Sequence, residues 1–399
     1  MQDETRTEDS SPENDFSLVN GGLLYDLLIR IPLIRIYRYG QLFRILLFIF
    51  VTWIPLLVFS LSEGFAFGRT VNFPFLHDVI VNARLLICVP LFLLSEIYID
   101  NRLKMVFKHL SNSGIIPESQ KSPWRTSLDR LTQQRDSILP ELIAFILAYL
   151  ITWGAVYVYG IIQTSRGMDS WMLLNDKITL PGYWYLIISL PVYQFLILRW
   201  IWRMHLWIQL LWRLSKLTLR LEPMHPDLAG GLAVIWLAQR VFNLVYLAIG
   251  VSLSAQLAHQ MIFEGISLLD TRSTVIGFLV VCMALLIFPL LFFFKKIMMT
   301  KNEGLIKYGA LGSQLADQFD DKWIDNKRKE DEAILGSTDP SAVADYSGSF
   351  EMIKQMRPLP IDLRELATVA LILLIPFIPL PLLKLSITEV LRKLMEILL

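Results

Sequence analysis

The chain has 399 residues, of which 54% are hydrophobic and only 18% charged, with a net charge of +1 and a mean hydropathy of +0.50. Soluble domains usually carry about a quarter charged residues, so this composition excludes an ordinary soluble protein. The net charge says nothing about nucleic acid, and no long basic run indicates a nucleic-acid partner, so none is expected. Apolar residues gather in blocks of about twenty, the length of helix that crosses a hydrocarbon core. The sequence therefore predicts an all-α, polytopic membrane protein.

The N-terminal segment is acidic and polar, and no basic region precedes an apolar stretch there. We therefore expect no cleaved signal peptide and a disordered tail over residues 1–21. Residues 22–40 mix aliphatic side chains with Arg30, Arg35 and Arg38. This pattern is typical of an amphipathic helix that lies in the headgroup layer.

Seven apolar segments are long enough to span a membrane, and six of them form a predicted bundle over residues 41–294. A cytoplasmic connection over 295–364 follows, and 365–399 holds the last span and an amphipathic C-terminal helix. The seventh segment contains three prolines, so it is either a kinked span or a re-entrant hairpin, and its apolar length favours the span. The spans are expected at about 42–61, 79–98, 140–162, 183–205, 228–257, 275–294 and 366–383.

Lysine and arginine are concentrated in alternate connections. The segments before span one and after spans two, four and six are basic. The intervening connections carry only Arg69, Arg166, Lys177 and Arg272. The positive-inside rule therefore places the N-terminus in the cytoplasm.

The fourth span continues into a basic, tryptophan-rich stretch that ends near residue 220. Arg199 and Arg203 lie one helical turn apart in it. We expect a long helix that leaves the bilayer along its inner surface, with arginines that contact acidic lipid headgroups. The alternative is that these arginines line a pathway for an anion.

The stretch LEPMHPDLAGGL, at residues 221–232, precedes the fifth span. Asp227 is placed to cap the exposed amides at the start of that helix. Gly230 and Gly231 permit another backbone to come close. The same amides also suit a bound anion or phosphate, so capping and anion binding both remain open.

A row of small and polar side chains recurs every three or four residues along the fifth span: Gln239, Asn243, Tyr246, Gly250 and Ser254. Arg240 lies beside this row, near the expected mid-membrane depth. Within the other spans, Glu96 near the inner end of span two is the only acid placed to neutralise it. A charge inside a span indicates a functional site by default. The row is equally typical of polar contacts that hold helices together.

Enzymatic and metal-binding motifs are absent: there is no nucleophile elbow, P-loop, HExxH or clustered His/Cys spacing. The sequence therefore favours a protein without enzymatic activity, cofactor or metal. The enzymatic alternative uses His225 as a general acid or base, with Arg213 and Arg220 binding the phosphate of a lipid. Cys88 and Cys282 fall in apolar blocks and predict small core residues rather than a disulfide.

The connection over 295–364 divides into DQFDDKWIDNKRKEDEA, which is typical of an exposed charged helix, and GSTDPSAVADYSGSF, which predicts a loop with turns.

Three stretches resemble recurring elements of bacterial integral membrane proteins of about this length: NFPFLHDVIVNARLLICVPLFLLSEIYI, the RW…R…W…HPDLAGGL run ending at residue 232, and LGSTDPSAVADYSGSFEMIKQMRPLPIDL. Together they resemble an uncharacterised family of bacterial polytopic inner-membrane proteins. The resemblance runs over most of the chain from the first span onward. It implies placement in a bacterial inner membrane and supplies no activity or catalytic residue. It also implies that residues 347–357 form a defined surface that docks beneath the bundle or onto a partner.

The leading functional hypothesis is movement of an anionic solute or ion along span five. Arg240, Gln239 and Asn243 would coordinate it at mid-membrane, and Asp227 and Gly230 would frame the inner mouth. The alternatives are an enzyme acting on a phosphorylated lipid and a sensor or scaffold. In the last case the 295–364 connection would bind a partner protein, or the chain would form a homo-oligomer.

Overall fold

The computed structural model describes residues 16–30, 40–67, 71–159, 169–175, 177–325 and 338–383. It is 80% helical, and seven of its helices are long and apolar enough to cross a membrane. The predicted all-α, multi-pass membrane fold is therefore confirmed. Within the described ranges, the only sheet is an antiparallel pair of two-residue strands, β1 (Leu173–Leu174) and β2 (Lys177–Ile178).

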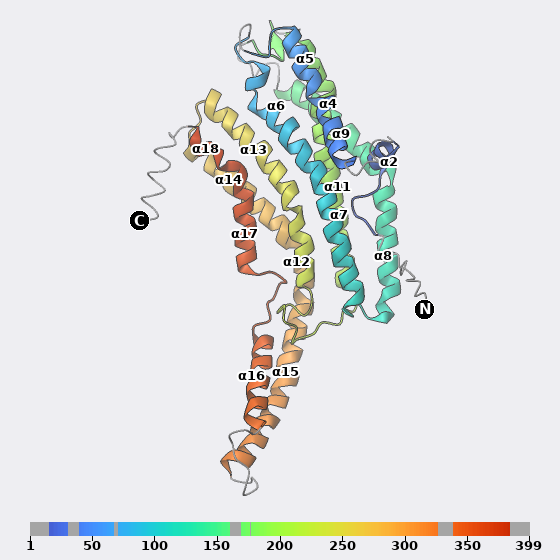
Figure 1. Ribbon diagram of the computed structural model, residues 1–399, viewed down its shortest axis with the longest axis vertical. Coiled ribbons are helices and arrows are strands. Elements are labelled where there is room, and N and C mark those ends of the chain that lie inside the picture. The colour runs from blue at the N-terminus through green and yellow to red at the C-terminus, as the bar shows by residue number, and fades with distance from the viewer. Residues whose placement is uncertain are drawn as a thin grey trace, which may run out of the picture.

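Each predicted span corresponds to a helical segment, and several segments are interrupted by a turn of 3-10 or π-helix (Figure 1). Spans one to four are α4–α5 (Gly40–Thr52, Ile54–Ser62), α6–η2–α7 (Val79–Ala83, Arg84–Cys88, Val89–Asn112), α9 (Ile138–Tyr159) and α10–η3–α11 (Leu180–Trp184, Tyr185–Ser189, Leu190–Lys216). Spans five to seven are α12–η4–α13 (Ala233–Gln239, Arg240–Phe242, Asn243–Phe263), α14–η5 (Leu268–Ile287, Phe288–Phe293) and α17–η7–α18 (Leu363–Leu374, Ile375–Phe377, Pro379–Leu382).

Spans two and four are longer than a bilayer requires. They contain 34 and 37 residues, whereas about twenty suffice to cross the hydrocarbon core. Their C-terminal halves pack with α8 (Glu118–Asp136), and Phe107, Trp124 and Trp207 are almost fully buried there. The fourth span therefore continues as a long helix, as predicted, but it enters a packed helical layer instead of lying along the membrane surface.

The sixth span also continues past the bundle. α15 (Phe294–Phe319) and η6 (Asp320–Ile324) extend it, and α16 (Asp339–Lys354) folds back beside α15 (Figure 1). We call α15, η6 and α16 the hairpin, and the end of the molecule from which it projects the hairpin end. The loop predicted over GSTDPSAVADYSGSF is wrong, because most of this stretch forms α16. Pro340 occupies the first turn of that helix, where a missing N–H is tolerated.

Part of the N-terminal region predicted to be disordered is packed against the bundle. Phe16, Leu18 and Val19 are buried against the bundle, so the end of the region 1–21 is ordered and packed. α2 (Leu23–Ile29) covers the first part of the interfacial helix predicted over 22–40. Residues 1–15 and 31–39 lie outside the described residues.

The proline-rich seventh segment crosses the bundle rather than re-entering. Its start is marked by an ion pair between Glu365 and Arg240, at the beginning of span five. Its end is marked by Phe377 and Leu380, which pack against Leu257 near the other end of α13. The segment therefore runs beside the whole length of α13, as the preferred prediction required. Residues 384–399, with the predicted C-terminal helix, lie outside the described residues.

Candidate functional site

Arg240, the centre of the predicted anion path, lies at the surface. It begins the 3-10 turn η4, and its side chain is 42% exposed. Its Nη1 atom lies 3.4 Å from a carboxylate oxygen of Glu365 in α17. The expectation that Glu96 is the only acid able to neutralise Arg240 is therefore wrong, because Glu365 pairs with it, and the conduit along span five loses its uncompensated charge.

The polar row of span five is buried in helix packing. The Gln239 side chain accepts a hydrogen bond from the indole of Trp207 at 2.5 Å. Gly250 leaves room for side chains of α14 and η7 that approach its Cα closely. The Asn243 Oδ1 atom and the Tyr246 hydroxyl are buried without a hydrogen-bond partner among the described residues. The row thus serves mainly as interhelical contact.

The Asp227 carboxylate already accepts hydrogen bonds from the backbone amides that were predicted as a possible anion-binding site. Its carboxylate accepts hydrogen bonds from the backbone N–H groups of Ala229 at 2.8 Å, Gly231 at 3.1 Å and Ala233 at 2.9 Å. Burial by itself would raise the pKa of Asp227, but these hydrogen bonds outweigh burial and lower it. Gly230 and Gly231 adopt φ values of +68° and +94°, a region that favours glycine. This geometry supports the capping interpretation.

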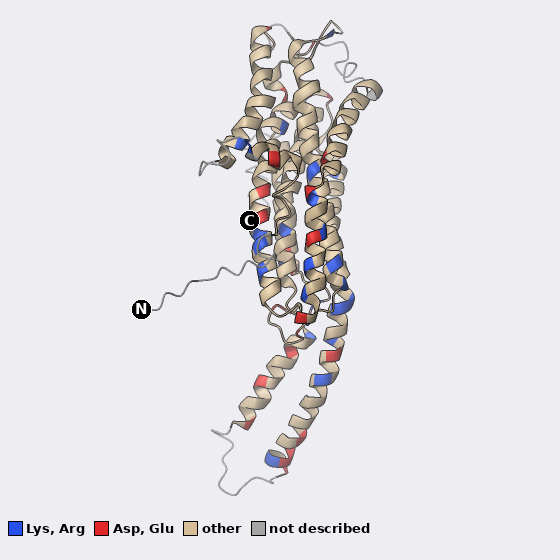
Figure 2. Cartoon of the chain, turned by 90° about the vertical axis from the view of Figure 1, so that its right-hand side faces the viewer, with Lys and Arg blue, Asp and Glu red and all other residues tan. Residues whose placement is uncertain are grey.

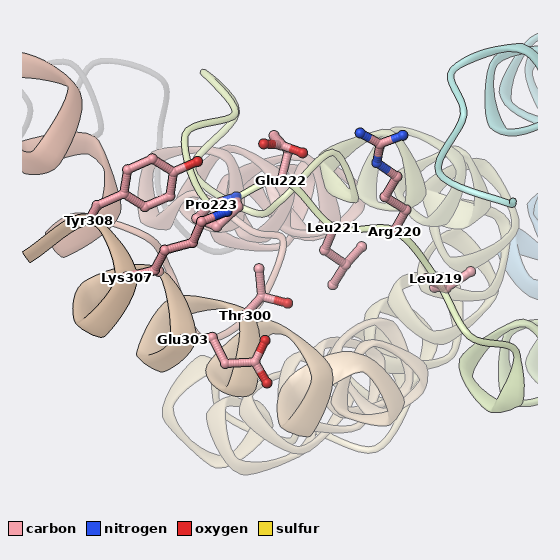
Figure 3. A pocket seen from close by; sticks show the side chains of 10 residues that line it. Leu219, Arg220, Leu221, Glu222, Pro223, Thr300, Glu303, Lys307 and Tyr308 are labelled. Atoms are coloured by element: carbon pink, nitrogen blue, oxygen red, sulfur yellow. The ribbon is translucent and has the colours of Figure 1, made fainter. Parts of the chain in front are cut away.

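The three residues of the enzymatic alternative do not assemble into one site. The Nδ1 atom of His225 lies 2.8 Å from the Asp227 carboxylate. α11 ends four residues before Arg220, which therefore leaves the helix face that carries Arg213. Arg220 lines a cavity of about 410 Å³ between segment 219–223 and α15, and Arg213 does not (Figure 3). The charged and aromatic residues of that cavity are Arg220, Glu222, Glu303, Lys307 and Tyr308.

A buried ion network, which sequence analysis missed, joins spans one to four. Glu96 of α7 accepts hydrogen bonds from Arg44 of α4 and from Arg199 of α11. Arg199 also lies 3.0 Å from Glu141 of α9. The four side chains are between 3% and 6% exposed. Arg199 was predicted to contact lipid headgroups or to line an anion path, but it is held between two carboxylates.

Arg203 extends the network toward the N-terminal segment 16–24. Its side chain is almost fully buried and donates to the backbone carbonyl of Val19. No carboxylate of the described residues lies within 4.0 Å of it. The same segment donates from the Leu24 amide to Glu141 at 2.9 Å and from the Ser17 hydroxyl to Asp100. The segment therefore closes the network from the hairpin end.

The sequence carried a signal for this network. Arg44 and Glu141 are isolated charges in the first turns of spans one and three, and Glu96 and Arg199 are charges near the corresponding ends of spans two and four. Charges at one depth on several spans predict a shared network.

A scan of family models and searches of curated proteins and of solved structures found no match for this chain. The chain is a polytopic helical membrane protein. Among the described residues, no group of three or more His, Cys, Asp or Glu side chains could hold a metal ion. Cys88 and Cys282 are buried free thiols, as predicted.

Proposed function

We propose that the protein is a membrane-anchored docking protein whose hairpin binds a partner with a basic surface. The main observation in support is that span six continues as one helical segment from Leu268 to Ile324, over 57 residues. At 1.5 Å per residue this segment is about 85 Å long, whereas a hydrocarbon core is about 30 Å thick. More than half of it therefore stands outside the bilayer.

The hairpin is built as a rigid projection. A Cβ atom at Gly304 would lie 2.8 Å from Pro223, and one at Gly312 would lie 2.7 Å from the Tyr346 hydroxyl, so both glycines permit close packing. Lys301 donates to the backbone carbonyl of Met356 at 2.8 Å and ties α15 to the segment that follows α16. These contacts hold the hairpin in a defined direction relative to the bundle.

The hairpin exposes large apolar side chains away from the bundle. Ile306 is 76% exposed, Leu311 49% and Ile324 68%. Two packed helices bury only one face each, so the outer faces stay in contact with water. Apolar side chains surrounded by polar ones are typical of a surface that associates with another protein.

Charge along the hairpin specifies the chemistry of the partner. Between residues 315 and 345 the chain has nine acids and four bases. The part of α15 nearest the bundle is basic, with Lys295, Lys296, Lys301 and Lys307 (Figure 2). Acidic lipid headgroups attract the basic part of α15 nearest the bundle and repel the acidic tip. The hairpin is therefore oriented away from the membrane surface. A basic partner surface complements that tip.

The test is site-specific photo-crosslinking in intact cells from a photoreactive residue at position 324, where the exposed Ile324 lies among the acidic residues of the tip. We expect one discrete adduct with a basic protein. The double variant Asp317→Lys with Asp345→Lys should weaken the adduct severalfold, because it reverses charge at the tip. Glu118→Lys, on exposed α8, is the matched control and should leave the adduct unchanged. An adduct composed of two copies of this chain, or no adduct, contradicts the proposal.

A second candidate function is anion movement, relocated from span five to spans two and four. It is favoured by the buried network, in which three arginines face two glutamates and Arg203 is satisfied by backbone carbonyls. An excess positive charge in a bundle of low dielectric attracts an anion. Chloride efflux from proteoliposomes should fall at least tenfold in Arg203→Gln and remain normal in Arg240→Gln. Equal efflux in both variants contradicts this candidate.

A further inference from the structure

Two π-helical turns lie side by side in the half of the bundle away from the hairpin. The turns are η2 in span two and η3 in span four, and each begins six residues before a proline, Pro90 or Pro191. Proline lacks the N–H that would continue the α-helical ladder, which explains the wider turns. The first residues of the two turns are joined, because Arg84 Nη1 donates to the Tyr185 hydroxyl at 3.3 Å. Turns of this kind are frequent at functional sites.

Arg84 makes no direct ion pair among the described residues, and Asp78 interacts with it only at longer range. Its Nε atom donates to the Ser252 hydroxyl at 3.4 Å, and its guanidinium lies 5.5 Å from the centre of the Tyr193 ring. No carboxylate of the described residues lies within 4.0 Å of it. The carboxylate of Asp78, six residues upstream, accepts hydrogen bonds from the Val81 amide and the Trp171 indole instead. A guanidinium inside a membrane bundle is costly without a compensating charge.

We propose that Arg84, Tyr185 and Ser252 bind a small monatomic anion such as chloride. Arg84 uses two of its five N–H donors on the two hydroxyls, which leaves donors for a ligand. The Tyr185 hydroxyl oxygen accepts from Arg84, so its own proton is free to rotate toward an anion. The Ser252 hydroxyl also accepts from Arg84 and hydrogen-bonds the Tyr193 side chain, which holds it at the site. Tyr185 and Tyr193 are 4% and 5% exposed, so side chains crowd the site and a single ion fits better than a carboxylate or a phosphate.

This site is separate from the hairpin, and its occupancy does not depend on the docking of a partner. It is also separate from the buried network around Glu96, which lies twelve residues, or about 18 Å, further along the same helix. Binding at Arg84 and efflux through the network can therefore fail independently.

The alternative is that Arg84 only ties the two π-turns together by hydrogen bonds. A glutamine would keep hydrogen-bonding groups but would remove the charge, whereas a lysine would keep the charge. An anion site therefore distinguishes Arg84→Gln from Arg84→Lys, and a purely structural tie does not.

The experiment measures the unfolding midpoint of the purified full-length protein while sodium chloride replaces sodium gluconate at constant ionic strength. We expect the midpoint of the unsubstituted protein to rise saturably with chloride, because a ligand of the folded state stabilises it. Arg84→Gln should lose the response, with an apparent Kd at least about tenfold weaker, the equivalent of one charge-assisted contact. Arg84→Lys should keep part of it. Arg240→Gln, which removes an exposed arginine paired with Glu365, is the matched control and should respond fully.

Two results overturn the proposal: an unsubstituted protein that is indifferent to chloride, and an Arg84→Gln variant that keeps the full response. If sodium formate shifts the midpoint and chloride does not, the site takes an oxyanion and the monatomic assignment is wrong. Should Arg84→Gln fail to fold, Tyr185→Phe and Ser252→Ala retain the charge and remove one hydroxyl each. Each should weaken chloride severalfold, and an unchanged apparent Kd in both refutes the site.

Discussion

Replacing Glu96 by glutamine tests whether the buried ion network holds spans one to four together. Glu96 is 4% exposed and accepts from both Arg44 and Arg199. Glu96→Gln keeps the size of the side chain but leaves three buried arginines facing a single glutamate, Glu141. Breaking a buried ion pair by removing one partner costs about 3–5 kcal/mol, because the remaining charge stays uncompensated.

The expected fall in melting temperature follows from the length of the chain. Unfolding entropy is about 2.1 cal/mol/K per residue, so the 399 residues give about 0.8 kcal/mol/K. A loss of about 3–5 kcal/mol then lowers the melting temperature by about 4–6 °C. Tryptophan fluorescence during a thermal ramp in detergent measures this shift.

The matched control is Glu365→Gln, which breaks a pair of the same chemistry at the surface. Arg240 and Glu365 are both 42% exposed, and exposed pairs contribute about 0–1 kcal/mol. The expected shift is about 1 °C or less. High salt should reduce this small effect and leave that of Glu96→Gln unchanged, because buried pairs are poorly screened. Equal shifts in the two variants would refute the reasoning, since they would mean that water reaches Glu96.

Three further predictions concern other parts of the structure. Leu18→Ala removes a fully buried side chain of segment 16–24 and should lower the free energy of unfolding by about 2–5 kcal/mol in a denaturant titration. Because the folded state lowers the pKa of Asp227, its carboxylate stabilises the fold above the unfolded pKa of about 3.9 and loses that effect as the pH falls through the lower folded value. The difference in melting temperature between the unsubstituted protein and Asp227→Asn should therefore be largest near pH 7 and shrink below about pH 4. Gly304→Ala forces a methyl group against Pro223 and should speed proteolysis of the hairpin, whereas Gly309→Ala, whose Cβ would meet nothing nearer than 3.9 Å, should not.

The ends of helices were harder to predict than their existence. Apolar length predicts a span because the hydrocarbon core excludes unpaired backbone groups. It does not give the full length of a helix, and the helical segments of spans two, four and six contain 34, 37 and 57 residues. α16 was mistaken for a loop because its serines, glycine and aspartates are poor helix formers. Packing of Tyr346 against Gly312 of α15 stabilises the helix that local preference disfavours.

Arg240 and Arg199 show where prediction of the site failed. Both arginines lie in largely apolar helices, and their neighbours along the chain do not show which of the two is buried. The partner of Arg240 is Glu365, 125 residues away, and a partner of Arg199 is Glu96, 103 residues away. One pair is exposed and the other is buried.

The sequence by itself determined that this protein lies in a membrane, and it located the seven apolar segments that form its spans. These properties depend on helix length, hydropathy and residues that are close together in the chain, so they can be predicted from the amino-acid sequence. Which charges are buried, which helices form the hairpin and where Arg84 lies without a direct ion pair were decided only by the tertiary structure. The free energy of a charged side chain depends on the groups that surround it in space, and those groups come from helices that are far apart in sequence.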